Sequence, residues 1–169
     1  NSWQVGAVLS DPDPTELVWD ECTLTELQNG SVLMSARIDD PHNTDRHHPD
    51  TNTSRLRTSR GFARSDDGGA SWAEVWTLYE RQPEILDSPC SDALVYSAKT
   101  GALYFGHPGE MDINEPHSAR SNYTIHRSLD QGASWSFLTV VFSAGAGYSD
   151  MHLLPTAPSW SSSSSSSGG

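Results

Sequence analysis

The chain is poor in lysine, in cysteine and in long hydrophobic runs. It has 169 residues, two cysteines and ten cationic residues, of which only Lys99 is a lysine, and its formal net charge is -12. This acidity argues against nucleic acid or an anionic membrane surface as a partner, because both are bound by a basic face. An arginine-rich stretch at 55–64 is interleaved with Ser and Thr and is expected to be a solvated strand. No apolar run approaches the roughly 20 residues of a membrane helix, so we expect no transmembrane segment.

Neither the cysteines nor the histidines indicate a disulfide or a metal site. Cys22 and Cys90 lie far apart in the sequence, and we expect two buried free thiols rather than a pair. The histidines, including the adjacent His47 and His48, lack the spacing of metal ligands. We expect them to be solvated loop residues, and we expect no metal and no cofactor.

Short β-rich segments cover most of the chain. Stretches such as "SVLMSARI", "DALVYSA", "ALYFGHP" and "FLTVVFSA" are rich in β-branched and aromatic residues, and helical periodicity is nearly absent. Residues 39–60 and 107–119 are polar and are predicted to be long surface loops. The Ser/Gly-rich tail at 159–169 cannot form a packed core. We therefore expect an all-β fold in one domain over residues 1–158, followed by a low-complexity tail.

A nine-residue repeat occurs twice, as "RSDDGGASW" at 64–72 and "RSLDQGASW" at 127–135. We expect each copy to be a hairpin turn in which the aspartate bonds turn amides, the glycine accepts a positive φ and the tryptophan packs beneath. This Ser-x-Asp-x-Gly-x-x-Trp pattern is the Asp-box, and two copies at blade-like spacing favour a β-propeller. The residues of the two copies are Ser65, Asp67, Gly69 and Trp72, and Ser128, Asp130, Gly132 and Trp135.

The segment "ECTLTELQNGSVLMSAR" at 21–37 is predicted to be a β-hairpin. A three-residue loop with Gly30 at positive φ gives one mostly apolar side, whereas a two-residue turn would mix apolar and polar residues on both sides. The pairs on that side are Leu24 with Met34, Cys22 with Ala36, and Glu26 with Val32. The same register puts Glu21 opposite Arg37. Such a pair is either a surface ion pair or part of a shared site.

Taken in order, these segments resemble the exo-α-sialidase (neuraminidase) family, and particularly its lysosomal branch. The resemblance rests on the hairpin at 20–38, the first Asp-box, "ARSNYTIHRSLDQGASW" and "AGAGYSDMHLL", and it runs from about Trp3 to Leu154. It implies the carboxyl-terminal part of a six-bladed β-propeller, about three blades. The Arg-Ile-Pro segment that supplies the family's first triad arginine, and the acid/base aspartate that follows it, have no counterpart in this sequence.

The resemblance also implies roles for four residues. Tyr148 is similar to the family's nucleophile and Glu21 to the carboxylate that takes the proton from its phenol. Arg37 and Arg120 resemble the second and third arginines of the triad that binds the sialic acid carboxylate, and Arg127 is a rival to Arg120 that fits the family spacing less well. A tyrosine suits this substrate because a carboxylate nucleophile would approach an anomeric carbon that carries its own carboxylate. Its phenol has a pKa of about 10 and therefore needs a base.

The implied function is hydrolysis of terminal sialic acid from glycoproteins, oligosaccharides or gangliosides, with retention through a tyrosyl intermediate. Without the first arginine and the acid/base aspartate, we expect this chain alone to have little or no activity. One alternative is a non-enzymatic Asp-box propeller that binds glycan or protein, and another is a relative that binds sialic acid without turnover. Sequons at Asn29, Asn52 and Asn122 and the resemblance favour a lysosomal or secreted location over a cytoplasmic or membrane-associated one.

Overall fold

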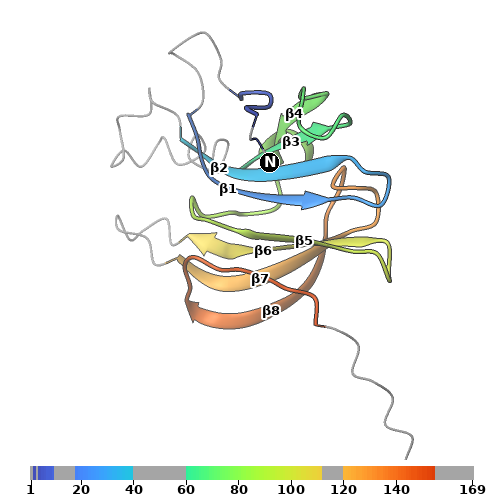
Figure 1. Ribbon diagram of the computed structural model, residues 1–169. Coiled ribbons are helices and arrows are strands. Elements are labelled where there is room, and N and C mark those ends of the chain that lie inside the picture. Colours follow the sequence, from blue (N-terminus) through green and yellow to red (C-terminus); the bar gives the residue numbers. More distant parts are fainter. Residues whose placement is uncertain (1, 3, 10–17, 40–59, 112–119, 155–169) are drawn as a thin grey trace, which may run out of the picture.

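The computed structural model describes residues 2, 4–9, 18–39, 60–111 and 120–154, which form two four-stranded antiparallel sheets (Figure 1). The first sheet has the order β1 (Val18–Glu26), β2 (Val32–Asp39), β3 (Arg60–Ser65) and β4 (Glu74–Thr77). The second has the order β5 (Ala93–Ser97), β6 (Ala102–Met111), β7 (Arg120–Ser128) and β8 (Ser136–Gly145). A four-residue helix, α2 (Leu78–Arg81), follows β4. The predicted all-β fold is confirmed.

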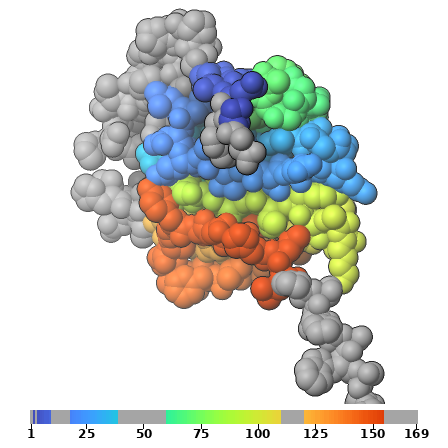
Figure 2. Space-filling model, viewed as in Figure 1, coloured from blue at the N-terminus to red at the C-terminus, as the bar shows by residue number. Residues whose placement is uncertain are grey.

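The main hydrophobic core lies between the two sheets. At its centre, Phe62 of β3 and Phe105 of β6 are both 0% exposed, and their ring centroids are 5.7 Å apart. Trp76 and Trp135 each stack on Phe62, also at 5.7 Å. Aromatic side chains of this size bury the largest apolar areas, so this cluster joins the sheets into one packed unit. Figure 2 shows the blue first sheet resting directly on the yellow and orange second sheet.

The first strands of the two sheets meet through hydrogen bonds. The hydroxyl of Thr23 donates to the backbone oxygen of Asp92 at 3.1 Å, and the hydroxyl of Thr25 accepts from the backbone N–H of Tyr96 at 3.2 Å. Because β5 is an edge strand, its outer backbone groups have no strand partner and need other bonding groups. Threonines on β1 supply them, which explains why the polar side of β1 is the side that faces the second sheet.

The two repeated turns connect β3 to β4 and β7 to β8 with the same hydrogen bonds. In the first, the Ser65 hydroxyl accepts from Gly69 N–H at 2.7 Å and donates to Asp67 at 2.8 Å. Asp67 in turn accepts from the backbone and the hydroxyl of Ser71 at 2.8 and 2.6 Å. The second turn repeats these contacts with Ser128, Gly132, Asp130 and Ser134. Gly69 and Gly132 have φ values of 91° and 89°, the left-handed region that favours glycine.

The tryptophans that end the two repeats lie in different environments. Trp135 is 5% exposed in the core between the sheets, and its backbone oxygen accepts from the side chain of Gln82 at 2.8 Å. Trp72 packs against a smaller cluster on the opposite face of the first sheet, formed by Met34, Ala36 and Ala63. Its ring N–H donates to the backbone oxygen of Ala7 at 3.3 Å. The repeat therefore builds equivalent turns, while the surroundings differ.

The β1–β2 hairpin follows the predicted register only in the half next to its turn. Leu24 pairs with Met34 and Glu26 with Val32, and Gly30 has a φ of 84° in a loop closed by Leu27 and Ser31. A bulge then shifts the register between Asp20 and Thr23, so that Asp20 pairs with Arg37. The predicted pairing of Glu21 with Arg37 is therefore wrong, and Cys22 lies inside the bulge, where two residues of β1 lie opposite Ala36.

Other expectations about burial need correction as well. Cys90 is buried, as predicted, but Cys22 is exposed, and both thiols are free. Residues 107–111 of the predicted surface loop belong to β6. Arg60, expected on a solvated strand, is 1% exposed, and His107 and His126 are 0% and 7% exposed rather than solvated. Each of these three side chains has polar partners inside the protein, as described below.

Several expectations fall on residues that the structure does not describe. These are the greater part of the loop at 39–60, with His47, His48 and Asn52, the remainder of the loop at 107–119, and the tail at 159–169. The division into a domain over residues 1–158 and a tail stays a prediction. In the described part of the chain, no helix is long and apolar enough to cross a membrane.

Candidate functional site

The hydroxyl of Tyr148 donates a hydrogen bond to Oε1 of Glu21. Tyr148 lies in the segment that follows β8, and 69% of its surface is exposed. Figure 2 shows this segment, in orange to red, at the surface of the second sheet below the blue first sheet. The bond to Glu21 and the negative charge of that carboxylate raise the pKa of the Tyr148 phenol. An exposed phenol with a carboxylate acceptor is an arrangement in which a proton can pass from one to the other as a substrate binds.

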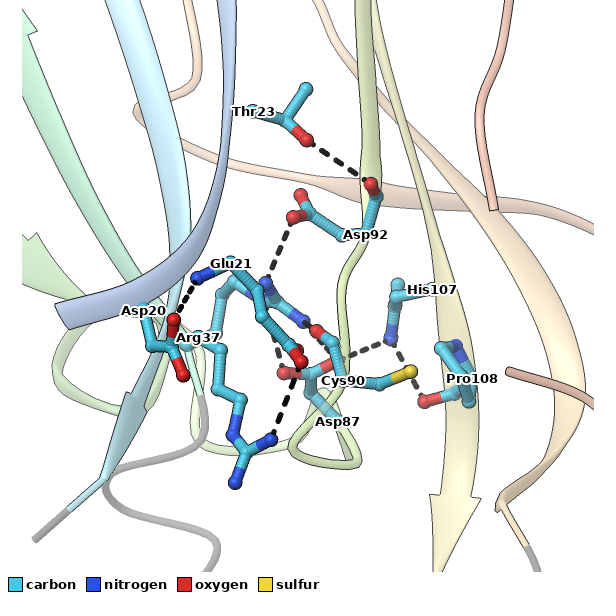
Figure 3. Close-up of polar contacts among 10 residues, drawn as sticks. Asp20, Glu21, Thr23, Arg37, Asp87, Cys90, Asp92, His107 and Pro108 are labelled. Carbon is cyan, nitrogen blue, oxygen red and sulfur yellow. Dashed lines mark hydrogen bonds and ion pairs between the residues drawn. The ribbon is translucent and has the colours of Figure 1, made fainter. Parts of the chain in front are cut away.

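Two arginines flank this pair. Nη1 of Arg37 lies 3.6 Å from Oε1 of Glu21, as Figure 3 shows. Cζ of Arg120 lies 5.9 Å from the centroid of the Tyr148 ring, and its charge opposes the rise in the pKa of the phenol. Arg120 begins β7, and its backbone oxygen accepts from Ala146 N–H at 2.7 Å, which ties β7 to the segment that carries Tyr148. The structure thus brings together the four residues that the sequence singled out.

Arg127, the rival to Arg120, is exposed and lies near the other end of β7, where it pairs with Ser136 beside the second repeated turn. It has no place in the group around Tyr148. This outcome agrees with the sequence spacing that favoured Arg120.

Glu21 sits on the bulge of β1, which directs its side chain toward the site. Its backbone has a φ of 47°, which is uncommon for a residue other than glycine. The Glu21 N–H donates to the side chain of Asp20 at 2.8 Å. A bulge places one extra residue on its strand and redirects a side chain. Glu21 therefore contacts Arg37 and Tyr148 although Asp20, and not Glu21, pairs with Arg37 in the ladder.

A buried ion network lies directly beside Glu21 and Arg37 (Figure 3). Arg60 donates to Asp87 at 3.1 Å, to Asp92 at 2.9 Å and to the backbone oxygen of Cys90 at 2.7 Å. The side chains of Arg60 and Asp92 are 0% exposed and that of Asp87 is 1% exposed. Burial alone would lower the pKa of Arg60, but the two carboxylates raise it. The guanidinium is therefore fixed in its charged form.

Two histidines extend this network across the second sheet. His107 Nδ1 lies 2.9 Å from Asp87, and its Nε2 lies 3.1 Å from Nδ1 of His126. Burial, together with the neighbouring His107, lowers the pKa of His126 to about 4. His126 is accordingly neutral at neutral pH. A cavity of about 550 Å³ lies beyond it, lined mainly by Ile85, Leu86, Trp135, Phe137 and Val140 as well as His126, and neither Tyr148 nor any of the three residues grouped with it lines this cavity.

Sequence reasoning missed Arg60, Asp87, Asp92, His107 and His126. One local signal was present, because His107 is two residues after the core residue Phe105 and therefore shares its face of the strand. No comparable signal marks Asp87 and Asp92, which lie in the connection between α2 and β5. The described residues include no group of three or more His, Cys, Asp or Glu side chains that could hold a metal ion.

No protein-family model and no curated protein matches the chain. Among solved structures it is similar to Hadza microbial sialidase Hz136, with 21% identity and a TM-score of 0.53 over 78% of this chain and 22% of that one. It is also similar to the intramolecular trans-sialidase from Ruminococcus gnavus in complex with oseltamivir carboxylate, with 20% identity and a TM-score of 0.50 over 77% of this chain and 25% of that one. The chain thus spans about a quarter of the length of each. At these identities the likeness shows a sialidase-like fold, without distinguishing the lysosomal branch.

Proposed function

We propose that the chain is part of an exo-α-sialidase that removes terminal sialic acid from glycans, with Tyr148 as nucleophile and Glu21 as its base. In this proposal the two sheets are blades of a six-bladed propeller of the lysosomal sialidase type, of which the chain supplies about three. The observation that carries the proposal is the hydrogen bond from Tyr148 to Glu21, residues 127 positions apart, with a guanidinium on each side. The sialidase-like fold of the two neighbouring structures supports it.

The contact suits a retaining mechanism in two steps. In the first, Glu21 takes the phenolic proton while the oxygen of Tyr148 attacks the anomeric carbon, the bond to the leaving-group oxygen breaks, and that oxygen takes a proton from solvent water. In the second, water attacks the same carbon and releases a proton to solvent, the bond to the tyrosine oxygen breaks, and Glu21 returns the phenolic proton to the phenolate. A neutral phenol can approach a carbon that carries a carboxylate, whereas an ionised carboxylate would be repelled by it.

The arginines would bind the carboxylate of the sugar. A guanidinium presents parallel N–H donors that match the two oxygens of a carboxylate, and such charge-assisted bonds are stronger than neutral ones. Arg37 contacts Glu21 and Arg120 lies over the ring of Tyr148, so a carboxylate held by both would place the neighbouring anomeric carbon near the phenol. In an otherwise acidic chain, these two cations would give the site its selectivity for an acidic sugar.

The test compares Tyr148→Phe with the unaltered chain. We expect the chain to bind an unsaturated sialic acid analogue and to turn over an aryl α-sialoside slowly, because an aryl leaving group departs with little protonation. Tyr148→Phe should bind the analogue with similar affinity, measured by calorimetry, and lose nearly all turnover. Full turnover by Tyr148→Phe would refute the assignment of the nucleophile, and failure of the unaltered chain to bind the analogue would refute a sialic acid site.

A second candidate function is sialic acid binding without turnover. It is favoured by the state of the two buried aspartates near Glu21, because Asp87 and Asp92 are bonded to Arg60 and so are not free to protonate a leaving group. Under this candidate, the unaltered chain binds the analogue with the same dependence on Arg37 and Arg120 but does not hydrolyse even the aryl substrate. The turnover assay above separates the two.

A further inference from the structure

The position of Glu21 depends on a backbone feature that needs support. The bulge between Asp20 and Thr23 breaks the β1–β2 ladder, and Glu21 within it adopts a φ of 47°. A residue other than glycine in this region costs on the order of 1–3 kcal/mol, so it persists only where surrounding contacts hold it. The proposed base is therefore carried by a segment that would relax if its contacts were removed.

Hydrogen bonds hold the bulge at both ends. On the amino-terminal side, Asp20 accepts from the Glu21 N–H at 2.8 Å. On the carboxyl-terminal side, the hydroxyl of Thr23 donates to the backbone oxygen of Asp92 at 3.1 Å. Asp92 belongs to the connection before β5 in the other sheet, so the second contact fixes the bulge relative to the neighbouring sheet (Figure 3).

Arg60 holds Asp92 in place. Each of its three guanidinium nitrogens donates to the connection at 87–92, through Nε to Asp87, Nη1 to Asp92 and Nη2 to the oxygen of Cys90. A side chain with a fixed fork of donors, itself 0% exposed, leaves this connection little freedom to move. Arg60 thus contacts Asp92, Asp92 contacts Thr23, and Thr23 adjoins the bulge that carries Glu21.

The same network keeps a second cation away from Glu21. Arg60 pairs directly with Arg37 across β2 and β3, and directly opposed residues point to the same side of a sheet. Because Asp87, Asp92 and the Cys90 oxygen occupy the nitrogens of Arg60, Arg37 is the arginine that contacts Glu21. A buried ion pair contributes little net stability compared with apolar residues, so stability alone does not account for this network.

We propose that Arg60 and Asp92 are positioning residues, which act through Thr23 to fix the bulge in β1 and thereby hold the carboxylate of Glu21 at the hydroxyl of Tyr148. The importance of this positioning for turnover rests on the function proposed above. The positioning itself is a statement about geometry and can be tested without substrate.

The experiment replaces Thr23 by valine, which removes the hydroxyl and keeps the shape of the side chain. The matched control is Thr25→Val, because Thr25 lies on the same strand and also bonds the backbone of β5, but two residues further from the bulge. The readout is the ionisation of Tyr148 in the full chain, followed by NMR of ring-labelled tyrosine and assigned with Tyr148→Phe. Thermal unfolding of each variant verifies that the fold is retained.

We expect Thr23→Val to lower the pKa of Tyr148 toward its ordinary value, since the displaced Glu21 would no longer raise it. Thr25→Val should lose similar stability and leave that pKa unchanged, and Thr23→Ser should restore it. Asp92→Asn, which keeps the backbone oxygen but weakens the bond to Arg60, should shift the pKa in the same direction by a smaller amount.

Equal shifts in Thr23→Val and Thr25→Val would overturn the proposal, because a general loosening of the sheets would then explain both. An unchanged pKa in Thr23→Val, where Glu21→Ala lowers it, would also overturn it. If Glu21→Ala has no effect either, the contact on which the proposal rests is absent in solution. A chain that follows the expected pattern but neither binds nor hydrolyses a sialoside would refute the proposed function and leave this positioning role intact.

Discussion

Tyr148 and Glu21 meet through their side chains although they are 127 residues apart. The tyrosine comes from the segment after the last described strand, and the glutamate from a bulge in the first strand. Whatever reaction the chain performs, the contact with Glu21 raises the pKa of the Tyr148 phenol.

We predict that Glu21→Gln lowers the pKa of the Tyr148 phenol. In the unaltered chain, the hydrogen bond to Glu21 and the charge of Glu21 both raise this pKa, and glutamine removes the charge. Glu26→Gln is the matched control, because Glu26 is an exposed glutamate on the same strand, opposite Val32. A titration of Tyr148 in which both variants shift equally would show that the overall charge, and not the contact, sets the pKa.

We predict that His126 makes the protein less stable as the pH falls below about 6.5. Its folded pKa of about 4 lies below the ordinary histidine value of 6.5, so between these values the unfolded chain binds a proton that the folded chain does not. The free energy of unfolding should therefore decrease from pH 6.5 to pH 4, on the order of 2 kcal/mol from this residue. Chemical denaturation across this range should show a shallower decrease for His126→Gln.

His152 provides the control for that measurement. Its side chain is 84% exposed, and its Nε2 lies 2.9 Å from the carboxylate of Asp150, which is also exposed. His152→Gln should follow the pH dependence of the unaltered chain. If His126→Gln does so as well, His126 is protonated in the folded protein and its burial is not the cause of acid sensitivity.

How much of this was predictable from sequence differs from one element to the next. The pairing of Leu24 with Met34 could be predicted because turn chemistry at Gly30 and the alternation of side chains are both local. The bulge at 20–23 could not be predicted, because the residues of β1 contain no local signal for it. The contact that holds it comes from Asp92, in the connection before β5. The burial of Arg60 could not be predicted either. Its partners lie in a connection about 30 residues further along the chain, so nothing near Arg60 in the sequence indicates them.

Tyr148 and the three residues grouped with it were found through family resemblance rather than through physical derivation. Residue spacing alone favoured a surface ion pair for Glu21 and Arg37 over a shared site. Only the folded chain shows that Tyr148 and Arg120 lie beside them. Long-range proximity of this kind depends on how one sheet packs on the next, which no local pattern encodes.

The two repeated turns allow a test of how the room around a glycine affects the cost of adding a side chain there. Gly69 and Gly132 have nearly the same φ, but a Cβ at Gly69 would meet nothing within 4 Å, whereas a Cβ at Gly132 would lie 2.8 Å from Cδ2 of Leu33. Leu33 is 0% exposed and cannot move freely. We predict that Gly69→Ala costs about 1–2 kcal/mol from backbone strain and that Gly132→Ala costs about 1–3 kcal/mol more. Equal midpoints in chemical denaturation would mean that the core adjusts at Leu33 without cost.

The arginines on β7 give the sharpest test of the ligand. Arg120 lies beside Tyr148, while Arg127 is exposed near the far end of the same strand, so the two substitutions change the net charge equally at different places. We predict that Arg120→Ala weakens binding of an unsaturated sialic acid analogue about tenfold to a hundredfold, because a charge-assisted bond to a carboxylate contributes roughly 1.5–3 kcal/mol. Arg127→Ala should leave the affinity nearly unchanged. Equal losses in calorimetry would mean that the analogue responds to the overall charge of an acidic protein, and a loss confined to Arg127→Ala would place the carboxylate site at the other end of β7.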